Sequence, residues 1–171
     1  MKLFLTLFLG FLSLFLTGVE AAQPNLSSAP TPTWIRQPTR LPAKVDLDDI
    51  SLGYYFELID YQVNLSEKSI YNKSVKVIFE DSGIENTGQV SINFDPSYQK
   101  LVIHEVKVIR EGKELNKLDI SKFRLVANES ELSRLIYNGN HTAYLVIGDF
   151  RKDDKLVIAY STISMWMIKV V

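Results

Sequence analysis

The chain has 171 residues, a length typical of one domain, with 19 basic and 20 acidic side chains, two histidines and no cysteine. A formal net charge of −1 leaves no basic surplus to neutralise phosphates, which argues against a nucleic-acid-binding protein. The lack of cysteine excludes disulfides, thiolate metal sites, iron–sulfur clusters and a cysteine nucleophile.

Residues 1–21 have the pattern of a secretory signal peptide. Lys2 supplies a positive charge, and 11 of the 14 positions in 3–16 are leucine or phenylalanine. We expect cleavage between Ala21 and Ala22. The apolar run is shorter than the about 20 residues that span a bilayer, which favours a cleaved signal over a membrane anchor. The pattern therefore predicts an exported protein, periplasmic or extracellular, that meets the membrane only transiently through its signal peptide.

Residues 22–44 form a proline-rich leader that holds five of the six prolines. Proline has no amide donor and a fixed φ, so we expect an extended segment that propagates neither a helix nor a sheet ladder. Trp34 and Ile35 are its apolar exception. We expect this pair to dock on the folded domain.

Residues 45–171 have the pattern of one β-rich domain. Alternating apolar and polar side chains predict half-buried strands, and the first two predicted strands form an antiparallel hairpin. The predicted strands cover residues 54–65, 70–80, 88–94, 101–110, 142–147 and 155–163. A tight-turn signal at Glu111-Gly112 leads from the fourth strand into residues 113–118. One parity of the first strand carries Tyr55, Ile59, Tyr61, Val63 and Leu65.

Two segments between these strands are less β-like. Residues 81–83 and 86–88 contain Asp-Ser-Gly and Asn-Thr-Gly, which predict turns. Helical spacing from Glu129 to Ile136 predicts one short helix, with Asn128 as its N-cap. The expected fold is therefore all-β: an antiparallel β-sandwich with one short helix, preceded by a signal peptide and a leader.

Several short motifs follow one another in this domain. The sequence Asp-Pro-Ser-Tyr at 95–98 precedes a strand that ends in Arg-Glu-Gly at 110–112, and the turn at Asp153-Asp154 leads into Ile-Ala-Tyr at 158–160. In order and spacing these motifs resemble the domain of unknown function 3857, an exported all-β domain of bacteria. The resemblance covers roughly residues 45–163. Asp153 departs from it, since the family usually has glycine there.

Members of that family commonly continue into a transglutaminase-like or cysteine-protease-like domain with a Cys-His-Asp site. The resemblance implies that this chain is an isolated or truncated amino-terminal module. Because it contains no cysteine, the thiol chemistry of such a downstream domain is absent from it.

Residue patterns indicate no catalytic, cofactor-binding or metal site. A catalytic histidine needs a partner nucleophile and an orienting acid, and none is legible around His104 or His141. The aspartates at 46, 48 and 49 lack the spacing of a calcium loop. Adjacent carboxylates at Asp153 and Asp154 are typical of a turn.

Aromatic side chains gather on the first predicted hairpin. They offer a candidate binding surface, for which core packing is the competing interpretation. Its residues are Tyr54, Tyr55, Tyr61 and Tyr71. We expect an exported, non-catalytic interaction or accessory module of the bacterial cell envelope, with an unknown protein or envelope polymer as its partner. The alternative is a carbohydrate- or cell-wall-binding module that uses these tyrosines, and a third hypothesis is an enzyme with unseen Asp or His chemistry.

Overall fold

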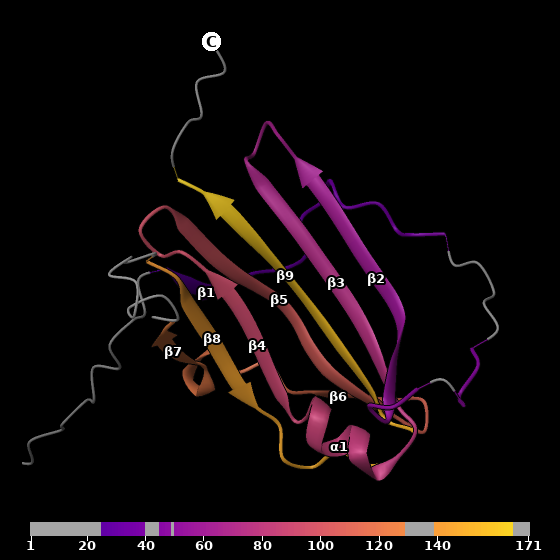
Figure 1. Cartoon of the computed structure of the whole chain (residues 1–171). Helices are drawn as coiled ribbons and strands as arrows, with labels where there is room; N and C mark the ends of the chain where they lie inside the picture. The colour runs from indigo at the N-terminus through magenta and orange to yellow at the C-terminus, as the bar shows by residue number, and fades with distance from the viewer. Residues whose placement is uncertain (1–24, 40–44, 49, 129–138, 166–171) are drawn as a thin grey trace, which may run out of the picture.

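A computed structural model describes residues 25–39, 45–48, 50–128 and 139–165 (Figure 1). The strands of this part form two sheets. The larger sheet contains β1 (Leu26–Ser28), β2 (Tyr54–Asn64), β3 (Ser69–Ile78), β5 (Gln99–Arg110), β6 (Lys113–Asn116) and β9 (Lys155–Ser164). The smaller sheet contains β4 (Gln89–Phe94), β7 (Arg124–Ala127) and β8 (His141–Val146).

The larger sheet has the order β1-β5-β9-β3-β2, with β6 paired to the end of β5, and the smaller sheet has the order β4-β8-β7. The six predicted strands are all present, with ends within two residues of the predicted ones, and β6 follows the predicted turn at Glu111-Gly112. The all-β sandwich with one short helix is therefore confirmed for the described residues, although β1 pairs with β5 in parallel.

The core lies between the two sheets. Alternate side chains of β4, β5, β8 and β9 fill it, as expected for strands covered on one face. Its fully buried members include Leu101, Ile103, Val106, Val108 and Leu156. A register shift between Ile103 and Glu105 lets Ile103 and Val106 both point inward, three positions apart. No core residue among those described comes from β2.

The α-helix of the described part is α1 (Asp81–Thr87), where two turns were predicted, and Ile120–Lys122 form a short 3-10 helix, η1. That prediction was wrong because Gly83 serves close packing instead of a turn: a Cβ there would collide with the carbonyl of Gly53. Ile84 packs against the core on the same helix. The helix predicted from Asn128 to Ile136 falls on residues 129–138, which lie outside the described part of the chain.

The leader was expected to form no sheet ladder, and three of its residues do so. Leu26–Ser28 pair in parallel with residues 101–103 of β5, and the Ala29 amide donates to the Ile103 carbonyl. Pro30 follows this stretch without interrupting it, so its missing amide falls outside the ladder. The expected docking of Trp34 is confirmed by its edge-to-face contact with Tyr71.

Candidate binding surfaces and a buried serine–histidine pair

A row of apolar side chains lies exposed along β2 and the turn that follows it. We call these residues the β2 strip. Their exposed fractions are 45% for Phe56, 71% for Ile59, 61% for Tyr61, 50% for Val63 and 86% for Leu65. The first strand was therefore predicted at the correct position, but its apolar side chains are exposed and not buried.

The ladder explains why these side chains are exposed. Paired residues of antiparallel strands point to the same face of a sheet. Tyr61 pairs with Asn72, Asn72 with Tyr160, and Tyr160 with Ile103. This row begins in the core at Ile103, which is fully buried, and ends exposed at Tyr61. The β2 strip thus continues the inner face of the larger sheet past the cover of β4, β8 and β7. Figure 1 shows β2 at the outer edge of that sheet, beyond β3.

A register shift between Phe56 and Leu58 divides β2. Residues of one parity consequently face opposite sides before and after it. Tyr55 pairs with Val77 on the outer face, whereas Ile59 and Tyr61 lie on the inner one. Residues that alternate regularly in the sequence of β2 therefore do not all lie on one face of the sheet.

The four tyrosines of the predicted binding surface are not brought together. Tyr61 is exposed, Tyr54 and Tyr55 are half-buried, and Tyr71 is only 2% exposed. Tyr54 stacks edge-to-face on Phe56, and Lys76 Nζ lies 4.9 Å from the centre of the Tyr54 ring. Tyr71 was wrongly assigned to a surface: it lies under the leader, on the outer face.

The leader crosses this outer face as a strap, which we define as residues 25–36. After β1 it passes over the larger sheet from β5 toward β2. Thr31 shares a hydrogen bond with Tyr71 on β3, and the Arg36 backbone exchanges two with the side chain of Gln62 on β2, at 3.0 and 2.7 Å. The strap thus contacts strands that are separated along the chain.

His104 and Ser161 form a hydrogen-bonded pair beneath the strap. The Ala29 carbonyl only accepts, so His104 Nδ1 donates to it at 2.9 Å. Nε2 then accepts from the Ser161 hydroxyl at 2.8 Å. The two residues are 57 positions apart on different strands, so no local motif could have revealed them. Ser161 is 1% exposed, and a backbone carbonyl takes the place that a carboxylate has in a catalytic triad.

Burial raises the pKa of Tyr71 to about 12, and the nearby charges of Asp60 and Glu105 act in the same direction. Burial also opposes ionisation of Glu105, but hydrogen bonds from Lys107 and Lys73 outweigh it and hold the pKa of this carboxyl below its usual range. Burial thus favours the neutral form of Tyr71, and the two lysines favour the charged form of Glu105.

Two cavities adjoin these strands. One, of about 340 Å³, lies beside β5 and β6 and is lined by His104, Glu105, Lys107, Glu114, Asn116 and Leu118. The other, of about 480 Å³, lies near the end of β8, where Lys117 and Asp149 form an exposed ion pair at 3.0 Å. Neither lining includes a serine or cysteine that could serve as the nucleophile of a triad. In the first cavity, Lys107 Nζ joins two carboxylates, at 2.6 Å from Glu105 Oε1 and 2.7 Å from Glu114 Oε1.

Two further residues singled out in the sequence make local contacts with the backbone. Asp46 Oδ1 accepts the Asp48 amide in an exposed loop, and His141 contacts the Gly139 carbonyl. Asp49, Ala21 and Ala22 lie outside the described residues. Within the described ranges, no three His, Asp or Glu side chains are close enough to hold a metal ion. No helix in that part is long and apolar enough to span a bilayer.

The family model of DUF3857, a domain of unknown function with a solved structure, matches residues 66–166. The chain belongs to this family. The resemblance in the motifs is thereby confirmed. The DUF3857 match runs from the turn before β3 to the end of β9, so the strap and β2 precede it.

A search of curated proteins found no match. Among solved structures, a protein of Parabacteroides distasonis described as a putative protease is similar, with 19% identity and a TM-score of 0.49. The alignment covers 56% of this chain and 19% of the other, so the DUF3857 chain spans about a fifth of that protein.

Proposed function

We propose that this DUF3857 chain is a non-catalytic module that binds a partner protein through the β2 strip. The observation that supports this is the exposure of Ile59, Tyr61 and Val63 on a face that is core elsewhere in the same sheet. Contiguous exposed apolar surface of this kind marks protein contact sites. An 11-residue strand at the sheet edge also offers unpaired backbone groups.

The chemistry of the strip favours a protein over a glycan. Sugar platforms depend on exposed aromatic rings, and the strip offers two, Phe56 and Tyr61, among aliphatic side chains. The buried position of Tyr71 removes it from such a platform. Aliphatic side chains make no hydrogen bonds to sugar hydroxyls, so the complementary surface is an apolar patch of a partner protein.

The absence of catalysis is part of this proposal. Ser161 and His104 are hydrogen-bonded, but Ser161 is enclosed under the strap and His104 Nδ1 is held by a carbonyl. A nucleophile needs access to substrate as well as a base. We propose that this pair fastens the strap to the sheet.

Export to the cell envelope is proposed from the signal-peptide pattern of residues 1–21. An accessory role beside a downstream transglutaminase-like domain remains a prediction from the family resemblance. Intact mass spectrometry of the protein from the envelope fraction of its native host tests export. A chain that begins at Ala22 supports it, and an uncleaved chain found only in the cytosol contradicts it.

Site-specific photocrosslinking tests the binding surface. A photoreactive amino acid replaces Tyr61 in the native host, and a matched control replaces Val146, which is 73% exposed on the smaller sheet. We expect a discrete protein adduct from position 61 that disappears when Ile59→Lys and Val63→Lys are added, and no adduct from position 146.

Three outcomes would contradict the proposal. They are an adduct unaffected by the lysine substitutions, equal adducts from both positions, and no protein adduct at position 61. An adduct with a second copy of this chain would make the strip a self-association surface and would likewise overturn the assignment to a partner protein.

A further inference from the structure

The free edge of β5 and the outer face of the larger sheet together carry a second site, separate from the β2 strip. We infer that the groove under the strap is a peptide-binding site of the DUF3857 domain, which this chain fills with its own residues 25–36. The ligand class is an extended peptide with an aliphatic residue at the position of Leu26 and an aromatic residue at that of Trp34.

The strap is held as peptide ligands are held by strand addition. Its backbone pairs with the free edge of β5: the Leu101 amide donates to the Asn25 carbonyl at 2.8 Å, and the Ala29 amide donates to the Ile103 carbonyl at 3.2 Å. Leu26 is its one fully enclosed apolar side chain, 6% exposed; it pairs with Leu101 and points past the edge of β5 into the core between the sheets. Backbone bonds give such ligands affinity, and a single side-chain pocket gives them specificity.

Two further side chains hold the strap through its backbone. His104 donates to the Ala29 carbonyl, and Gln62 accepts from the Arg36 amide and donates to its carbonyl. These contacts go to backbone atoms, so they fit many sequences in an extended conformation. Trp34 adds a ring contact on Tyr71, with centroids 6.5 Å apart.

The residues that line the groove lie almost entirely within the family match, whereas the strap that occupies the groove lies outside it. Leu101, Ile103, His104, Tyr71 and Ser161 all lie within residues 66–166, whereas the whole strap lies before residue 66. Of the receiving side chains named above, Gln62 alone lies outside the match. The domain therefore carries the receptor surface, and the occupant comes from the segment in front of it.

The fit of the strap is incomplete. Trp34 Nε1 is buried without a hydrogen-bond partner among the described residues, and burying an unpaired donor costs free energy. Beyond the point where the strap leaves β5, the cavity of about 340 Å³ continues from His104 to Asn116. A resident segment that leaves a donor unpaired and a polar cavity open beside it is one that a better ligand can displace.

Cleavage of the connection after folding tests this inference. A protease site is inserted between Lys44 and Val45 of the mature chain, and Trp166→Phe leaves Trp34 as the single tryptophan. After cleavage, we expect the strap to dissociate on dilution, with a change in Trp34 fluorescence, and to rebind reversibly. Circular dichroism should show that the β structure of the remaining body is retained.

Competition defines the specificity. A labelled peptide of residues 22–44 should exchange into the cleaved protein. The same peptide with Trp34→Ala should compete at least tenfold more weakly. The matched control is Thr33→Ala, since Thr33 is exposed, and this peptide should compete as well as the unaltered one.

A second arm uses the uncleaved chain. The double variant Leu26→Ala/Trp34→Ala should bind the labelled peptide, while the unaltered chain should exclude it. The inference is overturned if the cleaved strap never exchanges, if its release unfolds the body, or if neither the cleaved protein nor the double variant binds the peptide. Each of these results would make the strap a fixed part of the fold.

Discussion

Arg110 at the end of β5 forms a bidentate ion pair with Asp154, the residue before β9. Nε donates to Oδ1 at 2.9 Å and Nη2 donates to Oδ2 at 2.7 Å. The Arg151 amide donates to Oδ2 as well, at 2.8 Å. The two motifs that carry the family resemblance near residues 110 and 153 are therefore two halves of one contact. It ties the β5–β6 hairpin to the turn before β9.

Removal of the arginine should leave the carboxylate of Asp154 buried without its partner. Asp154 is 1% exposed, and an uncompensated buried charge costs about 3 kcal/mol or more. We expect Arg110→Met to lower the free energy of unfolding by an amount of this order in a urea titration. Lys117→Met, which breaks the exposed pair with Asp149, should cost less than about 1 kcal/mol. Equal effects of the two substitutions would show that Asp154 does not depend on Arg110.

Replacement of Asp153 by glycine should stabilise the protein. Its φ of 68° lies in the left-handed region, which side chains with a Cβ enter at a cost and glycine enters freely. The family usually has glycine at this position. We expect Asp153→Gly to raise the free energy of unfolding by up to about 1 kcal/mol, measured by thermal and urea unfolding. Lys152→Gly, in the same turn, should give no gain. A less stable Asp153→Gly protein would mean that the aspartate side chain contributes more stability than its positive φ costs.

Alkaline pH should destabilise the strap region through Tyr71. Its folded pKa of about 12 lies above the unfolded value of about 10. The unfolded chain therefore loses this proton first, and the stabilisation present below pH 10 is lost as the pH rises toward 12. A difference of about two units corresponds to about 2 to 3 kcal/mol. Urea titrations at pH 8 and pH 11.5 measure the loss.

Two variants separate Tyr71 from other ionisable groups in that experiment. Tyr71→Phe should flatten the alkaline loss, leaving a smaller slope from Tyr160, whose pKa burial also raises. Tyr61→Phe changes an exposed tyrosine and should leave the loss as it is. An unchanged alkaline slope in Tyr71→Phe would contradict the assignment.

Substitutions at the two ends of one ladder row should affect different properties. At the buried end they should lower stability, and at the exposed end they should weaken binding of the partner protein. Ile103→Ala, at the buried end, should cost about 2 to 5 kcal/mol of unfolding free energy. Tyr61→Lys, at the exposed end of the same row, should change it by no more than about 0.5 kcal/mol. It should also weaken binding of the partner protein found by crosslinking, measured as the amount of that partner retained in a pull-down. A large loss of stability in Tyr61→Lys would show that the strip is covered in solution.

The sequence predicted strand positions well because alternation and turn residues are local signals. It did not predict which face of β2 is covered, since that depends on how far the smaller sheet reaches across the larger one. The register shift at Phe56 and Leu58 also reversed the parity within a single strand. Helix α1 was missed because a glycine such as Gly83 can serve either a turn or a close packing contact, and the sequence does not distinguish the two.

The candidate sites were predicted less well than the strands. Ser161 and His104 meet across two paired strands, so only the register of β5 and β9 reveals them. The strap was predicted to form no sheet ladder because proline counts describe its average composition. They do not describe the five residues without proline between Pro24 and Pro30, three of which form β1. Tyr71 was assigned to a surface because aromatic content does not distinguish a covered ring from an exposed one.

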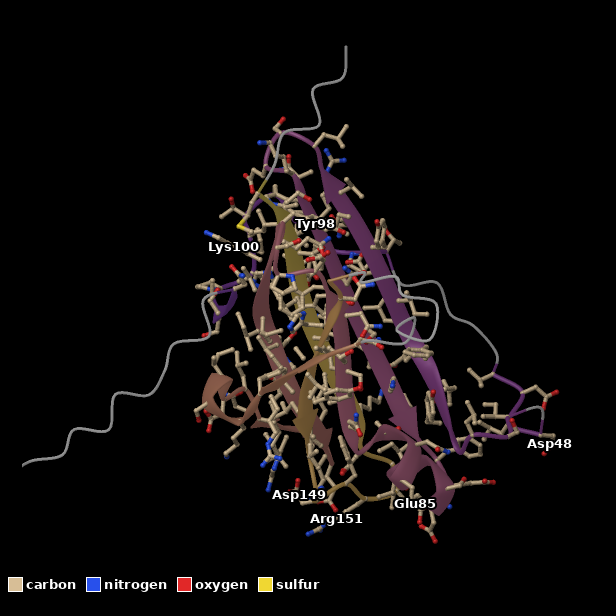
Figure 2. The ribbon with its side chains drawn as sticks, turned by 60° about the vertical axis from the view of Figure 1, so that its left-hand side comes forward. Asp48, Glu85, Tyr98, Lys100, Asp149 and Arg151 are labelled. Atoms are coloured by element: carbon tan, nitrogen blue, oxygen red, sulfur yellow. The ribbon has the colours of Figure 1, made fainter. Side chains whose placement is uncertain are left out.

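The two ends of the described domain lie beside each other. Asn25 accepts from Leu101, and the Met165 amide donates to the Tyr98 carbonyl, three residues away along the chain. Figure 2 shows Tyr98 and Lys100 at one end of the sandwich, and Asp149, Arg151 and Glu85 at the other. Domains with neighbouring ends tolerate circular permutation and insertion into a host loop. Joining position 165 to position 25 with a short linker and opening the chain at Gly112 should therefore give a permuted protein, and the whole domain could be spliced into another scaffold as a single detachable insert.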